Sequence, residues 1–431
     1  MKVCVQGLWH LGTVTAACLA HAGHDVTGLD DDGEDLRALA FGIPPLFEPG
    51  LEDLVGEGIA ADRLRFTADA ADALREADVL WVAFDTPVDE DDCANTSFVE
   101  ARVEAVSEHI APGTLVLISS QLPVGSTARL EDAFRRDHPG KNVTFACSPE
   151  NLRLGKAIEV FNSPDRVVVG VRSEADAERV AELLRPITDR IEWMSVESAE
   201  MTKHAINAFL ATSVAFMNEL STLCEEVGAD AKEVERGLKS ESRIGRRAYL
   251  APGAAVAGGT LARDLGFLAE VGRRVGSATP LVDGVRAANE AHKGWAGRRL
   301  MESLPDLEDK VIGVLGLTYK PGTDTLRRSG AVETCLWLSK HGANVRAHDP
   351  AVKELPDELR DAIRLADSVA DLMKGLDALI VATEWPEYRK LDVEQMVAAM
   401  KRPIILDPNG FLRDVLGADP RVSYRAVGIP R

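Results

Sequence analysis

A single helical stretch of unusual length, residues 198–230, separates two halves of the chain that have similar α/β patterns. Its uninterrupted pattern is far longer than the usual helix of about 11 or 12 residues. Ser198 is suited to cap its beginning, and Gly228 is suited to a left-handed position at its end. Apolar residues at helical spacing predict a wide apolar face. They are Ile206, Phe209, Leu210, Phe216, Met217, Leu220 and Leu223.

Two polar residues on this helix are candidates for a functional site. Lys203 and Asn207 are four residues apart near its start, so they project from one face of the helix. A solvated lysine and a surface asparagine are the ordinary alternative. The helix alone leaves both interpretations open.

The first half of the chain opens with the order of a dinucleotide-binding βαβ unit. An apolar strand at 2–6 leads into the turn GLWHLG at 7–12 and a helix, and a second strand at 25–29 ends at Asp30. Such a turn aims a helix N-terminus at a pyrophosphate, and the acid bonds the ribose hydroxyls. Asp30 favours NAD, because it would repel the 2′-phosphate of NADP. The fingerprint is imperfect, since Trp9 stands at its second glycine, and an ordinary α/β turn is the alternative.

Two later strands of this half, 79–83 and 115–119, end in polar loops that contain proline, at 85–87 and 121–125. Open parallel sheets bind ligands at the carboxyl ends of their strands. These loops therefore support a cofactor site at that edge.

The second half repeats the pattern, with a strand at 310–315, a turn at 316–324 and a helix at 331–340. Two mononucleotide-type sheets imply either two nucleotide-like ligands, or one ligand and one degenerate copy. We favour two ligands, because the second turn carries Lys320 and is followed by Arg327 and Arg328. Ordinary surface cations are the alternative.

Composition excludes several classes of function. The net charge of -20 argues against a nucleic-acid binder, because a phosphate-reading surface leaves a basic excess. No apolar stretch approaches the roughly 20 residues of a membrane span, and the N-terminus does not have the pattern of a signal peptide. The six cysteines and nine histidines are scattered, so neither disulfides nor a metal site is expected. We expect a cytoplasmic protein without nucleic-acid or membrane partners.

Several separated motifs link the chain to a known family. They are GHDVTGLD at 23–30, FEPGLEDL at 47–54, PVGST at 123–127, SPENLRLGKA at 148–157, PDRVVVG at 164–170, AEMTKHAINAFLAT at 199–212, GLTYKPGTD at 316–324 and ATEWPEY at 382–388. On these motifs the chain resembles the UDP-glucose/GDP-mannose dehydrogenases over essentially its whole length.

The resemblance implies an α/β fold with two Rossmann-like, doubly wound domains joined by a long central helix. The expected divisions are an NAD-binding domain at 1–197, a central helical and dimerisation domain with an active-site loop at 198–295, and a UDP-binding domain at 296–431. The family oxidises the C6 alcohol of a nucleotide sugar to a carboxylate in two NAD-dependent steps. A UDP-sugar is therefore the expected substrate.

Residue roles follow from the matched motifs. Lys203 and Asn207 would hold the reacting C6 oxygen, and the lysine cation would stabilise developing negative charge. Asp264 would be their acid/base partner with an ordered water, and Glu150 would assist thioester hydrolysis. Arg243 would reach a substrate in a neighbouring subunit, so a homodimer is expected, with the long helix at its interface.

The cofactor contacts expected from the turn, the strand-end loops and the resemblance are Gly7, Trp9, His10, Leu11, Gly12, Asp30, Thr86, Pro87, Gln121 and Arg327. The substrate contacts expected in the same way are Glu150, Asn151, Leu152, Arg153, Lys203, Asn207, Arg243, Gly258, Tyr319 and Lys320.

The chain departs from the family at its nucleophile. The family places a cysteine in a Gly-Gly-Ser-Cys stretch, and here that position is Thr260 in the run 258–264, GGTLARD. A thiol is activated to a thiolate by nearby charge, whereas an aliphatic hydroxyl is far weaker and needs a dedicated base. Gln121 also replaces the threonine that helps to hold the reactive water.

Three interpretations follow. In the favoured one, the first oxidation survives and the product is the C6 aldehyde. In the second, the aldehyde hydrates and is oxidised to the acid without covalent catalysis, which would give Glu150 a use. In the third, the chain binds NAD and a nucleotide sugar without turnover, but the presence of Lys203, Asn207, Glu150 and Asp264 together counts against this. Cys147, just before the SPEN loop, is expected to be a buried strand-end residue and not a relocated nucleophile.

Overall fold

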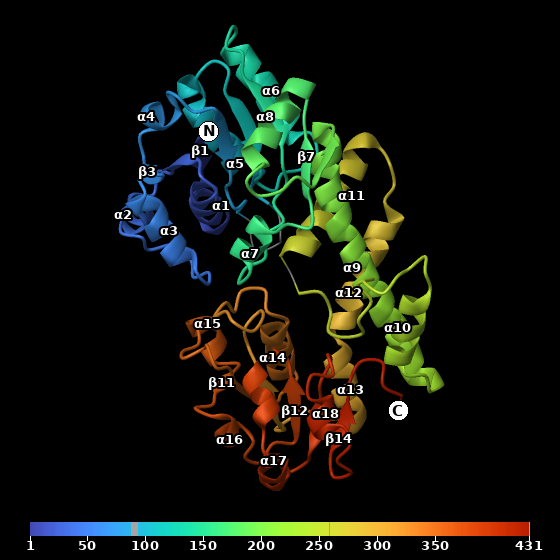
Figure 1. The fold of residues 1–431 in the computed structure, drawn as a ribbon. Helices are drawn as coiled ribbons and strands as arrows, with labels where there is room; N and C mark the ends of the chain where they lie inside the picture. Colours follow the sequence, from blue (N-terminus) through green and yellow to red (C-terminus); the bar gives the residue numbers. More distant parts are fainter. Residues whose placement is uncertain (88–93, 258, 431) are drawn as a thin grey trace. The chain divides into compact units, whose positions relative to one another are not determined.

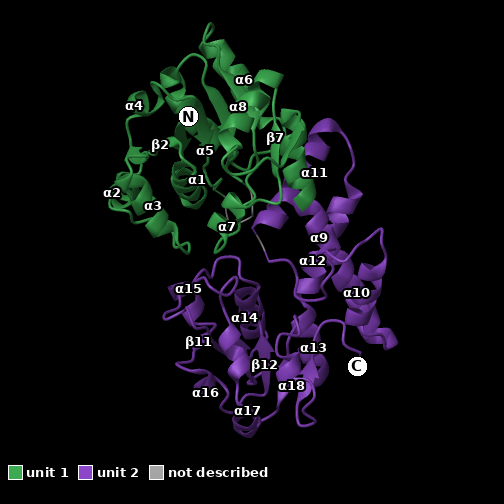
Figure 2. Ribbon diagram, in the orientation of Figure 1, with its two compact units in different colours: residues 1–206 green, residues 207–431 purple. Residues whose placement is uncertain are grey.

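The computed structural model describes residues 1–87, 94–257 and 259–430 (Figure 1). The chain divides into two compact units, Met1–Ile206 and Asn207–Arg431 (Figure 2). The boundary falls inside one continuous helix, so each unit is described on its own. The predicted three-part division into 1–197, 198–295 and 296–431 stays a prediction.

The first unit is an eight-stranded sheet covered by helices. Its strand order is β3-β2-β1-β4-β5-β6-β7-β8, parallel except where β6 meets β7. The strands are β1 Lys2–Gln6, β2 Asp25–Leu29, β3 Leu64–Thr67, β4 Val79–Val82, β5 Leu115–Ile118, β6 Thr144–Cys147, β7 Val167–Gly170 and β8 Ile191–Met194. The helices are α1 His10–His21, α2 Gly33–Ala40, α3 Leu51–Ala60, α4 Ala70–Leu74, α5 Thr96–Val106, α6 Ser126–Asp137, α7 Ala157–Asn162 and α8 Glu174–Leu184, with a 3-10 turn η1 at Ser107–His109.

The central strands are apolar because both faces of the sheet are covered. All four residues of β4 and of β5 are buried. Such near-continuous apolar runs are typical of parallel strands packed on both sides. The order reverses between β1 and β4, which is where an open sheet of this kind binds a dinucleotide.

The second unit has a six-stranded sheet in the order β11-β10-β9-β12-β13-β14, with every pair parallel. Its strands are β9 Val311–Leu315, β10 Asn344–His348, β11 Arg364–Leu365, β12 Ala378–Val381, β13 Ile404–Leu406 and β14 Ser423–Arg425. Its helices are α10 Ala231–Ser240, α11 Thr260–Val275, α12 Pro280–Lys293, α13 Trp295–Ser303, α14 Gly330–Lys340, α15 Asp357–Arg360, α16 Val369–Leu372, α17 Val393–Ala399 and α18 Arg413–Leu416, with a 3-10 turn η2 at Pro386–Lys390. The two sheets repeat one winding order, so the predicted pair of doubly wound α/β sheets is confirmed.

The long helix is α9, Val196–Val227, with 32 residues. It begins before Ser198, contrary to prediction, because the hydroxyl of Ser195 accepts a hydrogen bond from the backbone nitrogen of Ser198 at 3.3 Å, as an N-cap does. Gly228 has φ +81°, as its predicted place at the helix end requires.

The predicted apolar face of α9 is only partly buried. Met217 is buried, but the side chains of Phe209, Phe216 and Leu223 are exposed. In the second unit, α9 packs through its small residues Ala208, Ala211 and Ala215, which form one cluster with Leu265 and Val285 of α11 and α12. Alanine on this side lets the helix backbones approach closely, so the larger side chains turn outward.

Among the described residues, none of the helices is long and apolar enough to cross a membrane. The described part of the chain also contains no group of three His, Cys, Asp or Glu side chains placed to hold a metal ion.

Candidate active site

The turn between β1 and α1 is shaped by two glycines. Gly7 has φ +90°, and a Cβ there would lie 2.6 Å from the ring of Phe84. A Cβ at Gly12 would overlap the carbonyl oxygen of Gly7. Trp9 has φ −71°, which any residue adopts, and its side chain is 48% exposed. The backbone therefore does not require glycine at position 9, and the turn keeps the close approach that a pyrophosphate needs.

Acids surround this turn. Asp30, just after β2, accepts a hydrogen bond from the backbone nitrogen of Leu8 at 2.7 Å, which closes the turn. Asp85, just after β4, accepts one from the backbone nitrogen of Leu11 at 3.2 Å, in the first turn of α1. Thr86 is buried, and its hydroxyl donates to the carbonyl oxygen of Gln121 at 2.8 Å. The two strand-end loops expected near the cofactor thus lie side by side.

The ammonium group of Lys203 is held by the SPEN loop. Its Nζ donates to the carbonyl oxygen of Glu150 at 2.7 Å and to Oε1 of the same residue at 3.2 Å. The other carboxylate oxygen of Glu150 accepts from the backbone nitrogen of Leu152 at 2.8 Å. Both side chains are largely buried, with 11% and 21% exposed. Lys203 is therefore a fixed cation with one ammonium hydrogen beyond those that Glu150 uses.

A small cavity of about 10 Å³ lies beside Lys203, with room for about one water molecule. Its wall includes Ser120, whose buried hydroxyl has no hydrogen-bond partner within the described part of the chain. Cys147, the last residue of β6, lies in the same wall and is 4% exposed. Burial, and after it the negative charge of Glu200, raises the pKa of its thiol well above the usual range. The thiol therefore stays protonated and is a poor nucleophile.

Two further residues of α9, Glu200 and His204, hold the neighbouring loop, and neither was predicted as a site residue. The carboxylate of Glu200 accepts from the backbone nitrogens of Gly125 at 2.6 Å and Thr127 at 2.9 Å, at the N-terminus of α6. His204 Nε2 lies 2.9 Å from the carbonyl oxygen of Leu122. Both lie in the AEMTKH motif, but their partners are more than 70 residues away in sequence, so spacing alone could not have paired them.

The second unit contains its own polar cluster. Nδ2 of Asn207 donates a short hydrogen bond to Oδ2 of Asp264, which is fully buried in α11. Thr260 is the first residue of α11 and is exposed, one helical turn before Asp264. Gly259 precedes it with φ +105°, and Gly258 lies outside the described residues.

Arg328 lies near the beginning of α11. Its Nη1 is 3.8 Å from the position that a Cβ on Gly259 would take. Its backbone φ of +60° is uncommon for a residue other than glycine. Arg328 therefore approaches this loop. The predicted place of Arg327 near the cofactor stays a prediction.

The remaining predicted substrate residues are spread over three segments. Asn151 and Arg153 are exposed on the SPEN loop, whereas Leu152 packs against the core of the first unit. Tyr319, 41% exposed, and Lys320 lie in the turn after β9. Arg243 lies beyond α10, largely exposed, and its Nε is 3.0 Å from Oε1 of Glu241. The predicted role of Arg243 in a neighbouring subunit stays a prediction.

Asp349, the residue after β10 in the second sheet, is hydrogen-bonded to the neighbouring turn. Oδ2 of Asp349 accepts from the backbone nitrogens of Leu317 at 2.7 Å and Thr318 at 3.0 Å and from Nε1 of Trp385 at 3.1 Å. Burial alone would raise the pKa of this carboxyl, but these hydrogen bonds outweigh it and hold the pKa below its ordinary value of 3.8. Asp349 therefore acts as a clamp on the turn.

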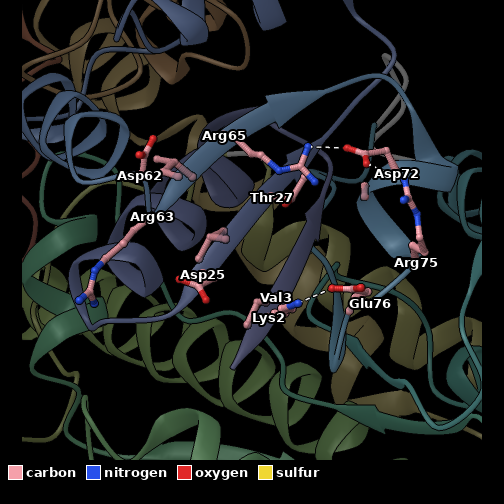
Figure 3. A pocket seen from close by; sticks show the side chains of 14 residues that line it. Lys2, Val3, Asp25, Thr27, Asp62, Arg63, Arg65, Asp72, Arg75 and Glu76 are labelled. Carbon is pink, nitrogen blue, oxygen red and sulfur yellow. Dashed lines mark hydrogen bonds and ion pairs between the residues drawn. The ribbon is translucent and has the colours of Figure 1, made fainter.

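A hollow of about 370 Å³ in the first unit lies at the amino ends of β1, β2 and β3 (Figure 3). This is the edge of the sheet opposite Gly7 and Asp30. Three of its four basic side chains are paired within it: Arg65 and Arg75 with Asp72, and Lys2 with Glu76. We assign no ligand to this hollow, because its charges largely satisfy one another.

Comparison with known proteins identifies the family. Residues 1–188 match the NAD binding domain of the UDP-glucose/GDP-mannose dehydrogenase family, residues 197–291 its central domain and residues 313–414 its UDP binding domain. UDP-glucose 6-dehydrogenases of Pseudomonas aeruginosa and Rhizobium meliloti are 33% and 34% identical, over 100% of this chain and 98% and 100% of theirs.

Solved structures agree with these matches. A UDP-glucose dehydrogenase from Pyrobaculum islandicum superposes with a TM-score of 0.85 at 31% identity, over 94% of this chain and 93% of that one. A UDP-D-ManNAc dehydrogenase from Pyrococcus horikoshii gives a TM-score of 0.86 at 26% identity, over 99% of both chains. The chain therefore belongs to the UDP-glucose/GDP-mannose dehydrogenase family and is an NAD-dependent oxidoreductase acting on a CH-OH group, as its motifs predicted.

Proposed function

We propose that the chain oxidises the C6 hydroxyl of a UDP-sugar and releases the C6 aldehyde. The UDP-sugar rests on the match to the family's UDP binding domain and on relatives that are UDP-glucose 6-dehydrogenases. The aldehyde rests on one observation, which is that Thr260 begins α11 where the family resemblance calls for a cysteine.

The turn of the first unit fits NAD. Gly7 and Gly12 leave the space that side chains would fill, and the N-terminus of α1 favours a pyrophosphate. Asp30 disfavours the extra phosphate of NADP. When bound, NAD supplies the hydride acceptor for the oxidation.

Lys203 is the residue that we assign to the reacting oxygen. As the C6 hydroxyl loses its proton and a hydride leaves C6, negative charge develops on the oxygen. A fixed ammonium with one hydrogen beyond those bound to Glu150 stabilises that charge. Asn207 and Asp264 would orient the sugar and accept the proton, and their mutual hydrogen bond supports joint action.

The contacts of Glu150 bear on the choice between aldehyde and acid. A role in thioester hydrolysis would leave Glu150 without use in an enzyme that stops at the aldehyde. Its bonds to Lys203 and Leu152 give it a role in the first oxidation, since it holds the cation in place. These contacts support the aldehyde proposal, because they give Glu150 a use that needs no hydrolytic step. Cys147 does not replace the missing thiol, because it is buried and protonated.

The proposal is tested by incubating the protein with NAD and a panel of UDP-, GDP- and TDP-sugars and recording NADH. Replacing Lys203 with alanine should reduce turnover by at least about 100-fold, the usual effect of removing one charge-stabilising group, with the Kd for NAD nearly unchanged. Lys141→Ala is a matched control, because Lys141 is bound to the carbonyl oxygens of Glu108 and Ile110.

Two outcomes would contradict the proposal. Unchanged turnover by Lys203→Ala would overturn the site assignment, and binding of NAD and nucleotide sugars without NADH formation would favour a non-catalytic protein. The homodimer, with Arg243 serving the partner's site, and the cytoplasmic location stay predictions. Sedimentation of the purified protein tests whether it is a homodimer.

A further inference from the structure

We propose that Glu48 is a positioning residue for both ligands, because one buried carboxylate holds the cofactor turn and the nucleotide-sugar loop together. Glu48 lies in the FEPGLEDL motif at 47–54, for which no role is predicted. The cofactor half of the inference rests on the NAD-binding turn, and the substrate half rests on the proposed function of the SPEN loop.

The carboxylate of Glu48 is almost entirely buried and has partners on two segments. Its Oε2 lies 3.0 Å from Nε2 of His10 and accepts a hydrogen bond from the backbone nitrogen of Gly155 at 2.7 Å. Its Oε1 accepts a hydrogen bond from the backbone nitrogen of Ala157 at 2.8 Å. The side chain of Glu48 is 1% exposed and that of His10 12% exposed. All of these contacts lie within the first unit.

The first segment is the pyrophosphate turn. His10 is the first residue of α1 and stands between Trp9 and Leu11. The nitrogens that can face a phosphate belong to this turn, so a side chain anchored at position 10 sets where they point. The fold supplies that anchor from Glu48, 38 residues away in sequence.

The second segment is the loop between β6 and α7. Glu150 fixes its beginning by accepting from the backbone nitrogen of Leu152, and Glu48 fixes its end at Gly155 and Ala157. Between the two clamps lie Asn151 and Arg153, both exposed and both expected to contact the substrate.

A buried carboxylate with several hydrogen bonds is costly to remove, because its donors are then left unpaired. Replacing Glu48 with glutamine keeps the volume but removes the charge and offers a donor where two backbone nitrogens need acceptors. At least one of the two bonds to the loop is then lost, and the bond to His10 loses its charge. Both ligand sites should therefore loosen together.

The experiment measures the Kd for NAD and the Kd for the nucleotide sugar that the panel identifies, by calorimetry on the full-length protein. Glu48→Gln should weaken both by about tenfold, the effect of losing one hydrogen bond to a charged group. His10→Phe should weaken NAD alone, because the amides of Gly155 and Ala157 keep Glu48. Glu131→Gln is the matched control, because Glu131 is an equally buried acid of the first unit that pairs with Arg135 and Arg172. It should leave both constants unchanged.

A purely structural role for Glu48 would lower the melting temperature in Glu48→Gln and in Glu131→Gln alike without changing either Kd, and this result would overturn the inference. Weakening of only one ligand by Glu48→Gln would also overturn it. If Glu48→Gln does not fold, Glu48→Asp, which keeps the charge but is too short to span both segments, should weaken both ligands. If the unaltered protein binds NAD but no nucleotide sugar, the proposed function and the substrate half fail. An NAD affinity of Glu48→Gln equal to that of the unaltered protein would overturn the inference and leave the proposed function untouched.

Discussion

Replacing Thr260 with cysteine tests why the chain is expected to stop at the aldehyde. Thr260 is exposed at the first position of α11, a helix of 16 residues. Nη1 of Arg328 lies 3.8 Å from where a Cβ on the preceding Gly259 would be. A thiol at position 260 would therefore meet a helix N-terminus and a nearby cation, the two features that commonly activate cysteines.

The thiolate fraction of a cysteine at position 260 can be estimated from the helix N-terminus. A helix N-terminus stabilises an anion by about 0.3–1 kcal/mol, which multiplies the thiolate population by about 1.7–5. At pH 7 an ordinary thiol is about 3% ionised, so this contribution alone gives roughly 5–15% thiolate. The positive charge of Arg328 would also raise the thiolate fraction. A thiolate at this level adds to the aldehyde, and the thiohemiacetal passes a second hydride to NAD and leaves a thioester, which water hydrolyses to the acid.

The assay follows NADH formed from a limiting amount of nucleotide sugar in excess NAD. Thr260→Cys should release a second equivalent of NADH and an acid, and iodoacetamide should abolish that second equivalent alone. Thr260→Ser, which keeps a hydroxyl, is the matched control and should remain at one. A Thr260→Cys protein that folds and turns over but still gives one NADH and no acid would refute the reasoning, as would two equivalents from Thr260→Ser.

Three further perturbations test the roles assigned to Asp85, Cys147 and Asp349. Asp85→Asn should lower the Kd for NAD by about two- to fivefold at low salt and by less at high salt. The reason is that the negatively charged Asp85 carboxylate accepts a hydrogen bond from an amide of α1, where the pyrophosphate is expected. A higher Kd for NAD in Asp85→Asn would contradict this. Iodoacetamide should leave activity intact, because burial raises the pKa of the Cys147 thiol; rapid inactivation with mass-spectrometric labelling of Cys147 would contradict this. Asp349→Asn should destabilise the protein by about 1–3 kcal/mol at neutral pH. The folded-state pKa of Asp349 is depressed, so its contribution is present above pH 3.8 and is lost as the pH falls further. The melting temperature should therefore fall less between pH 7 and pH 3 in Asp349→Asn than in the unaltered protein. An equal fall in both proteins would count against the role of Asp349 as a clamp.

Much of the fold could be predicted because parallel strands have a local signature. Buried strands such as β4 and β5 are continuous apolar runs, and each ends in a polar loop. The winding order then follows from the general rules for such sheets. The predicted cap of α9, Ser198, lies three residues after the observed cap, Ser195. Both serines are plausible caps, and only the hydrogen bond between them decides.

The site was predicted less completely, because its supports connect distant parts of the chain. Trp9 weakened the dinucleotide fingerprint, yet the backbone there has an ordinary φ and needs no glycine. Glu48 meets the backbone of Gly155 107 residues away, and Glu200 meets Gly125 75 residues away. A carboxylate that bonds backbone amides leaves no pattern of side-chain types, so the sequence has no signal for these pairs.

Our expectation of a single oxidation at C6 rests on the absence of a thiol at position 260. It is tested most directly by the molar ratio of NADH formed to nucleotide sugar consumed by the unaltered protein, with a carbonyl reagent present to trap the product. We expect a ratio of about one and a trapped aldehyde. A ratio of two with a stable uronic acid and no trapped aldehyde would contradict it.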